Sequence, residues 1–460
     1  MKELNLKQSY QTLIGKNFSL KIWFKGKVLI FSLILILMTG FLGCKGHQQS
    51  DIPLKKKVKP GVEVFLEKHL DLIKGKKVGL ITNPSGIDSN LNSTVDLFYQ
   101  NPEINLVALY GPEHGVRGNA QAGQYVPFYV DERYHLPVFS LYGQSRRPEL
   151  GMLKNIDEYM RSFDTQIEGK VPKKEMVKNI EVMVFDIQDV GTRIYTYIAT
   201  MAYAMEACAQ NNIDFIVLDR PNPINGLDME GPLLEYPQYS SFVGLYPIPV
   251  RHGLTVGELA ILFNHRFLKE KAKLQVIPLK GWQRKMWYDQ TGLPLVNPSP
   301  NMPTLTTATI YPGQVFLEGT NLSEGRGTTK PFELFGAPWI DGYKLAKKLN
   351  RLHLPGVAFR EAWFTPTFSK YQGKLCGGAQ IYVNDRNRYR PLATTLYIIK
   401  TIKDLYPDQF KFHEEYFDKI MGTSTTRKAL ERGLSIQKII DSYRQQLDDF
   451  REMRKSYLLY

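Results

Sequence analysis

Short apolar runs rich in Val and Ile recur along the chain and predict six buried β-strands. Because each run is continuous rather than alternating in polarity, it is typical of a strand covered on both faces. Apolar residues at helical spacing predict four helices, and the last of these follows Thr255 with Glu258 three residues on, as in a capping box. The predicted strands are 78–82, 106–110, 138–142, 182–187, 215–218 and 274–279, and the predicted helices are 61–69, 93–100, 197–209 and 256–267.

Alternating buried strands and helices predict an α/β fold with a Rossmann-like, mainly parallel sheet. The pattern changes after residue 280, where 281–309 is Pro-rich and irregular, 357–383 has the character of strands and 392–460 is mainly helical. We therefore predict a Rossmann-like catalytic domain at 61–325 and a smaller α+β C-terminal domain at 326–460, which closes the cleft.

The first 60 residues have the pattern of an export signal and a tether. A basic stretch ends at Lys27, an apolar run of about 11 residues follows, too short to span a bilayer comfortably, and Phe-Leu-Gly precedes Cys44. This ending resembles the lipobox of bacterial lipoproteins, so we predict a signal peptide at 1–44, lipidation of Cys44 and a flexible tether at 45–60. The protein would then lie in the bacterial cell envelope, anchored to a membrane and facing the periplasm or the surface; an uncleaved N-terminal anchor is the alternative.

The formal net charge of +14 invites a nucleic-acid partner, but the charge is unevenly placed. Residues 1–43 hold six Lys against one Glu, and residues 44–59 hold five Lys against one Asp. More than half of the excess therefore belongs to the signal and the tether, and we predict no nucleic-acid partner. With 43% apolar and 23% charged residues, the composition also excludes global disorder, collagen and coiled coil.

Residue spacings exclude several chemistries. Cys208 and Cys376 lie far apart in the body of the chain, which favours buried thiols over a single disulfide and supplies no metal motif. The eight His are scattered, and no Walker loop, Gly-x-Ser-x-Gly elbow or Gly-x-Gly-x-x-Gly fingerprint occurs. We predict neither a metal nor a cofactor.

Polar loops rich in Gly or Pro follow five of the predicted strands. Because ligands bind outside the carboxyl ends of strands in open α/β sheets, these loops together predict a binding site. The five loops are 83–86, 111–115, 143–147, 188–193 and 219–223.

The loop Gly-Pro-Glu-His-Gly at 111–115 is the densest candidate for chemistry. Its glycines let the backbone approach a ligand, Glu113 could act as a general acid or nucleophile, and His114 could orient it. A turn in which Glu113 caps the next helix is the alternative.

Other loop residues are candidates for substrate binding. Asp189 and Arg193 could face the cleft, or they could form a structural ion pair. Asn83 and Asn222 could bind sugar hydroxyls, although Asn is also an ordinary turn former. His252 precedes the capped helix, and a lone His is more often structural.

A Gly-rich loop supplies a second group of charged residues, Glu318, Glu324 and Arg326. Glu324 is the candidate partner carboxylate for Glu113. Four aromatic residues could stack on sugar rings or pack in the core: Trp339, Trp363, Phe364 and Tyr371.

Together these motifs resemble the NamZ-type exo-β-N-acetylmuramidases, which are glycosidases of peptidoglycan recycling. The resemblance implies a Rossmann-like domain, a smaller C-terminal domain, and hydrolysis of a terminal non-reducing N-acetylmuramic acid (MurNAc) in the cleft between them. It also implies that Glu113 is the catalytic carboxylate, while Glu324, Asp189 and Glu230 compete for the partner role. The matching segments are 79–86, 111–115, 185–195, 218–223, 318–328 and 364–369.

MurNAc carries a lactyl carboxylate that N-acetylglucosamine lacks, so its recognition calls for an Arg or Lys. We predict that Arg117, Arg193 or Arg326 supplies this cation. Two other functions stay open: a non-catalytic lipoprotein that binds muropeptide sugars, and an amide hydrolase at the lactyl–peptide bond. The sequence does not choose between retention and inversion, which depends on the distance between the two carboxyl groups.

Overall fold

A seven-stranded sheet dominates the first part of the computed structural model, which describes residues 58–143, 146–154, 156 and 179–460. Its order is β3-β4-β2-β1-β5-β6-β7, and all neighbours are parallel except β3, which is antiparallel to β4. Without the short β3, the order along the chain is 3-2-1-4-5-6, the order of the Rossmann fold, so the predicted fold class is confirmed. The strands are β1 (Lys77–Thr82), β2 (Asn105–Gly111), β3 (Tyr129–Val130), β4 (Pro137–Ser140), β5 (Val182–Asp186), β6 (Asp214–Leu218) and β7 (Leu274–Ile277).

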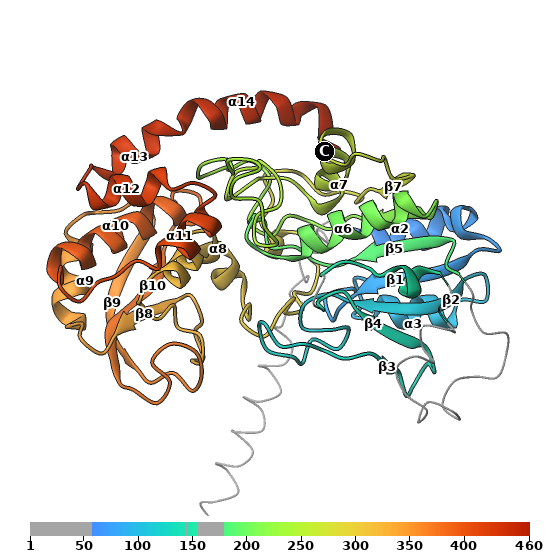
Figure 1. Cartoon of the computed structure of the whole chain (residues 1–460), viewed down its shortest axis with the longest axis horizontal. Helices are drawn as coiled ribbons and strands as arrows, with labels where there is room; N and C mark the ends of the chain where they lie inside the picture. Colours follow the sequence, from blue (N-terminus) through green and yellow to red (C-terminus); the bar gives the residue numbers. More distant parts are fainter. Residues whose placement is uncertain (1–57, 144–145, 155, 157–178) are drawn as a thin grey trace, which may run out of the picture. The chain divides into compact units, whose positions relative to one another are not determined.

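Helices cover both faces of this sheet (Figure 1). Alternate residues of β5 point to opposite sides, because Val182 and Val184 pack in one core while Met183 and Phe185 pack in the other. Burial on both faces explains the continuous apolar runs from which the strands are predicted. One face carries α2 (Gly61–Lys68) and α3 (Thr94–Gln100), and the other carries α6 (Tyr197–Gln210) and α7 (Val256–Arg266).

A second, smaller sheet is antiparallel, with the order β8-β10-β9. Its buried residues Phe359, Ala379 and Ile381 join the same core as α6 and α7, so one core serves both sheets. Residues 56–460 correspondingly form one compact unit, within which the predicted boundary at 325/326 falls in the loop before β8. This part contains β8 (Leu334–Ala337), β9 (Val357–Phe364), β10 (Cys376–Val383), α8 (Leu305–Gln314), η4 (Val315–Gly319), α9 (Gly342–Asn350), α10 (Pro391–Leu405), α11 (Glu414–Met421), α12 (Thr425–Glu431), α13 (Ile436–Ser442) and α14 (Arg444–Arg454).

Side-chain caps begin several of the helices. The capping box predicted for α7 is confirmed, since the Thr255 side chain accepts a hydrogen bond from the Glu258 backbone N–H while the Glu258 carboxylate accepts one from the Thr255 N–H. Ser93 caps α3 and Asp341 caps α9 in the simpler one-sided way.

The prediction of irregular structure through residue 309 is wrong for its last residues, because α8 begins at Leu305. Thr304 caps this helix by accepting a hydrogen bond from the Thr307 N–H. Gly313 is needed for packing rather than for a turn, since a Cβ at this position would lie 2.0 Å from the Pro391 carbonyl oxygen of α10. In sequence, Pro312 and Gly313 are typical of a helix end, although both lie inside α8.

Cys208 and Cys376 are both buried and unbridged, as predicted. In the part of the chain that the structure describes, no helix is long and apolar enough to cross a membrane. The predicted signal peptide, Cys44 and nearly all of the tether lie outside the described residues.

Candidate active site

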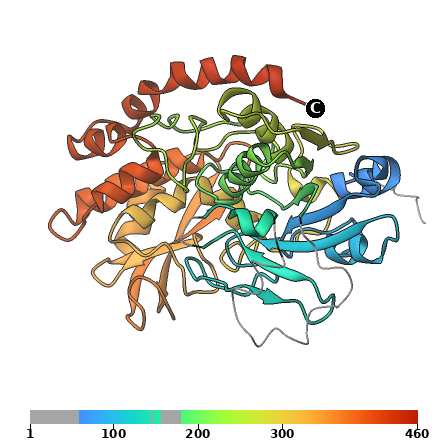
Figure 2. The ribbon, with the colours of Figure 1, turned by 45° about the vertical axis from the view of Figure 1, so that its right-hand side comes forward.

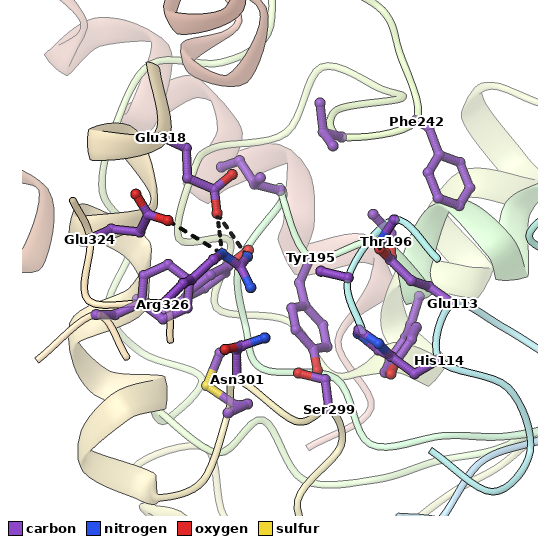
Figure 3. Close-up of a pocket in the computed structure, with 18 of the residues that line it drawn as sticks. Glu113, His114, Tyr195, Thr196, Phe242, Ser299, Asn301, Glu318, Glu324 and Arg326 are labelled. Atoms are coloured by element: carbon purple, nitrogen blue, oxygen red, sulfur yellow. Dashed lines mark hydrogen bonds and ion pairs between the residues drawn. The ribbon is translucent and has the colours of Figure 1, made fainter. Parts of the chain in front are cut away.

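A cavity of about 620 Å³ lies at the carboxyl ends of the Rossmann-like strands. One wall comes from the loops after β2, β4 and β5, and the opposite wall comes from the segment 318–332 with Lys370 and α11. Four residues predicted from the sequence as site residues line it: Glu113, His114, Glu324 and Arg326 (Figure 3).

Glu113 enters the cavity from a tight turn after β2. The Gly115 N–H donates to the Pro112 carbonyl oxygen at 2.9 Å, and Gly115 has φ of 76°, a conformation that favours glycine. The Glu113 carboxylate accepts hydrogen bonds from the Gly123 N–H at 3.0 Å and from the Thr196 hydroxyl at 2.8 Å. Since Thr196 follows β5, loops from two strands hold the carboxylate in position.

His114 is buried beside Glu113, and its protonation is determined by its surroundings. Its Nδ1 lies 2.7 Å from the Ala120 carbonyl oxygen. Because a carbonyl oxygen only accepts, we assign the ring proton to Nδ1. Burial lowers the pKa of His114, so the ring is neutral and its Nε2 is an acceptor.

The opposite wall carries two carboxylates that share one guanidinium. Arg326 donates to Glu318 Oε1 from Nη2 at 2.8 Å and from Nε at 3.1 Å, and its Nε lies 3.6 Å from Glu324 Oε1. The Glu318 side chain is 16% exposed, against 2% for Glu324. Tyr416 of α11 donates its hydroxyl proton to Glu318 at 3.1 Å, which ties the helix to this wall.

Lys370 holds this wall together. Its ammonium group donates to the carbonyl oxygens of Leu317, Thr320 and Leu322 at 2.7–2.9 Å and lies 3.0 Å from Glu324 Oε2. A cation with four oxygen neighbours keeps the 317–324 segment and the buried Glu324 in one arrangement.

The floor between the walls is built from the segment that contains Ser299 and Asn301 (Figure 3). Asn83 and Tyr197 both donate to the Pro298 carbonyl oxygen, at 3.0 Å and 2.5 Å. Asn83, a predicted site residue, therefore supports the floor from behind and does not line the cavity. The Asn301 side-chain nitrogen is buried without a hydrogen-bond partner in the described structure.

The structure does not bring Arg117 or Arg193 to the cavity. Arg117 pairs with Asp131. Arg193 is 2% exposed, and its guanidinium donates to four backbone carbonyl oxygens, two of which belong to residues Ile420 and Met421 of α11. Burial lowers the pKa of Arg193 to about 9. Its four hydrogen bonds make this guanidinium a structural link between two distant parts of the chain.

The remaining predicted residues form a buried support behind the cavity. His252 Nε2 lies 3.4 Å from Asp189 Oδ2, so Asp189 lies beside His252, and the described residues show no ion pair between Asp189 and Arg193. The Asn222 amide donates to the Leu254 carbonyl oxygen at 2.9 Å. Glu230 lies elsewhere, 3.7 Å from a buried guanidinium nitrogen of Arg251, and burial raises its pKa to about 7.

The sequence did not single out several lining residues. Tyr142 directly precedes the predicted loop 143–147, and Thr196 lies just after the predicted loop 188–193, so the neighbourhood of these loops was the available signal. Lys370 and Tyr416 carry no local signal, because their partners are distant in sequence. Among the aromatic candidates for stacking, Trp363 is 58% exposed, whereas Trp339 and Tyr371 pack against the core.

The described residues contain no group of three or more His, Cys, Asp or Glu side chains placed to hold a metal ion. The chemical groups of the cavity are instead carboxylates, hydroxyls, amides and cations. Such a set suits acid–base chemistry on a polar, uncharged or anionic ligand.

Comparison with known proteins identifies the family. Residues 78–166 and 161–306 match the description "Exo-beta-N-acetylmuramidase NamZ, N-terminal", and residues 309–460 match "Exo-beta-N-acetylmuramidase NamZ, C-terminal". The chain belongs to the NamZ family. The two matches adjoin just after the start of α8. Residues from both matched parts line the cavity.

A relative named NamZ is similar over most of both chains. The sequence is 53% identical over 407 residues to "Peptidoglycan beta-N-acetylmuramidase NamZ" of Bacillus subtilis (strain 168), which covers 88% of this chain and 92% of the relative. Crystal structures of two DUF1343 family proteins from Bacteroides fragilis NCTC 9343 are also similar. They have TM-scores of 0.75 and 0.66 and identities of 40% and 29%, and each comparison covers 88% of this chain and 99% of the other.

Proposed function

We propose that this protein is an exo-acting glycosidase that releases terminal non-reducing MurNAc from peptidoglycan fragments such as MurNAc–GlcNAc, for cell-wall recycling. The observation that carries the proposal is the 53% identity, over nearly the whole length of both chains, to a peptidoglycan β-N-acetylmuramidase. The cavity agrees with it, because it places carboxylates on two facing walls without a metal cluster among the described residues.

Glu113 is the proposed catalytic carboxylate. The two hydrogen bonds from the Gly123 N–H and the Thr196 hydroxyl fix its orientation at the cavity wall. A glycosidase needs such a positioned carboxyl group to protonate the leaving oxygen, to attack the anomeric carbon or to activate water. The neutral His114 beside it offers Nε2 as an acceptor for a hydroxyl of the substrate or of water.

Glu324 is the proposed partner carboxylate, as its place in the sequence predicts. The cations Lys370 and Arg326 lie on either side of it and hold it in position. A second carboxyl group on this wall could stabilise positive charge developing on the sugar. Glu318 is its competitor, because it lines the same wall and is the more exposed of the two.

A chromogenic MurNAc β-glycoside tests the activity. We expect release by the wild type and a loss of kcat of at least about a hundredfold in Glu113→Gln, which keeps the shape but removes the ionisable group. Glu324→Gln should lose more activity than Glu318→Gln. Glu132→Gln is the matched control, because Glu132 is an exposed carboxylate of the same domain outside the cavity.

The same measurement separates the alternatives. If the wild type binds MurNAc–GlcNAc but releases nothing, the protein is a sugar-binding protein and the glycosidase proposal fails. Full activity in Glu113→Gln would instead refute the role of Glu113 alone.

We also propose that the protein is a lipoprotein of the bacterial cell envelope, anchored to a membrane through Cys44. The basic stretch, the apolar run and Phe-Leu-Gly before Cys44 support this. In cells fed an alkyne-labelled fatty acid, the wild type should carry the label in the membrane fraction, and Cys44→Ala should carry none. Cys208→Ser, which changes a buried thiol of the body, should keep the label. An unlabelled wild type, or label retained in Cys44→Ala, would rule out lipidation at Cys44.

A further inference from the structure

The cavity contains four Lys and Arg side chains, and two of them are already neutralised. Arg326 lies between Glu318 and Glu324, and it also stacks on the Phe332 ring. Lys370 is surrounded by three carbonyl oxygens and Glu324. An anionic ligand group at either position would meet the carboxylates that these cations already serve.

Arg146 and Lys419 are the other two cations of the cavity. Neither forms an ion pair with any residue in the described part of the chain, and both are exposed. They differ in how they are held. The Arg146 guanidinium lies 4.9 Å from the centre of the Tyr142 ring and 5.0 Å from that of Phe242, whereas Lys419 projects from α11 as a flexible side chain.

Contact with two aromatic rings positions Arg146 to bind a carboxylate. Its guanidinium lies within 5.0 Å of both ring centres, as in a cation–π contact, and no ion pair uses its charge in the described part of the chain. A guanidinium can offer a carboxylate two parallel hydrogen bonds. Lys419 could offer only a point charge.

Arg146 is also on the same wall as Glu113. Tyr142, whose ring contacts the Arg146 guanidinium, lines the same cavity as Glu113. Burial, and next the Glu113 carboxylate, raise the pKa of Tyr142 to about 12. Figure 3 shows Phe242 on the side of Glu113 and Thr196, across the cavity from Glu318 and Arg326. Arg146 and the Tyr142 ring that it contacts therefore line the same cavity as Glu113.

The presence of Arg146 in the same cavity as Glu113 suits the chemistry of MurNAc. Its lactyl ether is attached two ring atoms from the anomeric carbon, so the lactyl carboxylate lies within one sugar ring of the bond that is cleaved. Near Glu113 such an anion is repelled unless a free cation receives it.

We propose that Arg146, supported by Tyr142 and Phe242, binds the lactyl carboxylate of MurNAc and selects this sugar over N-acetylglucosamine. The inference rests on the proposed function and gives its site a specificity-determining residue. It replaces the cations predicted from the sequence for this role, since Arg117 and Arg193 lie outside the cavity and Arg326 is neutralised within it.

Two substrates that differ only in this charge test the proposal: a chromogenic MurNAc β-glycoside and its lactyl carboxamide. We expect the wild type to prefer the acid, and Arg146→Met to lower the acid-to-amide ratio of kcat/KM at least tenfold, mainly through KM for the acid. Arg146→Lys should restore part of the ratio, because it returns the charge without the paired N–H groups.

Arg147→Met is the matched control. Arg147 follows Arg146 in the same loop, and its guanidinium also contacts an aromatic ring, 4.2 Å from the centre of Tyr203. Unlike Arg146, it forms an ion pair, with Glu206 at 2.6 Å. Its removal should leave the acid-to-amide ratio unchanged.

The possible outcomes are distinct. Suppose that the wild type cleaves both substrates. If Arg146→Met then keeps the wild-type acid-to-amide ratio of kcat/KM, or loses both activities equally, Arg146 does not bind the lactyl carboxylate. An acid-to-amide ratio that falls in Lys419→Met but not in Arg146→Met would also refute the role of Arg146. Cleavage of neither substrate by the wild type would instead overturn the proposed function, and this inference with it.

Discussion

At the scale of single residues, Lys370 shows how a side chain can organise a cavity wall without touching the reaction. Its ammonium group satisfies three carbonyl oxygens of the 317–322 segment and lies against a carboxylate that is 2% exposed. Removing Lys370 would leave the buried Glu324 with Arg326, at 3.6 Å, as its remaining cation in the described structure, and losing one partner of a buried pair costs more than the pair itself contributes.

We therefore expect Lys370→Met to lower the free energy of unfolding by about 2–4 kcal/mol, measured by urea denaturation. Part of the loss should be recovered in the double variant Lys370→Met/Glu324→Gln, because the poorly compensated buried charge of Glu324 is then gone. Lys374→Met, at an exposed neighbouring lysine, serves as control and should change little. A double variant no more stable than Lys370→Met would contradict this account.

The candidate site was predictable where chemistry follows directly from local sequence. Glu113 and His114 were found because their motif follows a strand, and the carboxyl ends of parallel strands share one edge. Arg117 and Arg193 were predicted to bind the substrate, because the sequence does not show which protein groups already bind these side chains in the fold. The carbonyl oxygens that occupy Arg193 come partly from residues more than two hundred positions away, at Ile420 and Met421.

At the scale of elements, the strands of the larger sheet could be predicted because burial on both faces leaves a simple pattern. All six predicted strands are present, and β4 and β7 end two residues earlier than predicted. The short β3 was missed, since two half-buried residues at a sheet edge give no pattern. Helix α8 was hidden by Pro312 and Gly313, whose role is close packing against α10.

At the scale of the whole molecule, the last helices cross from the smaller sheet to the larger one. Helices α13 and α14 run past the second sheet toward α7, as both ribbon views show (Figures 1 and 2). Beyond them, the Tyr460 hydroxyl donates to Asp219 Oδ2 at 2.7 Å and accepts a hydrogen bond from the Leu279 N–H at 2.6 Å. Tyr460 thereby closes the segment onto the ends of β6 and β7.

The stability that this contact gives to the folded state should depend on pH. Burial raises the pKa of Asp219 to about 7, above its value of about 3.9 in the unfolded chain. The folded state therefore holds the proton more tightly, and its stability falls as the pH rises through 7. The Tyr460 hydroxyl opposes this fall, because a hydrogen bond to the ionised carboxylate is stronger than one to the neutral form.

We expect Tyr460→Phe to cost about 1 kcal/mol at pH 6 and about 2–3 kcal/mol at pH 8.5 in urea denaturation. Tyr110→Phe is the control, since its hydroxyl donates to the Met152 carbonyl oxygen, which does not titrate, and its cost should be equal at both pH values. A cost for Tyr460→Phe that is independent of pH would show that Asp219 does not titrate in this range.

The four backbone carbonyl oxygens that bind the Arg193 guanidinium limit how chimeras of this protein can be built. Its guanidinium comes from the part of the chain that matches the N-terminal family description, and two of its four acceptors belong to α11 in the part that matches the C-terminal one. Helix α11 also carries Tyr416 and Lys419 to the cavity. A chimera that exchanges C-terminal halves between relatives must keep this backbone geometry at the junction. Because the acceptors are backbone oxygens, this link depends on the position of α11 rather than on the side chains of that helix.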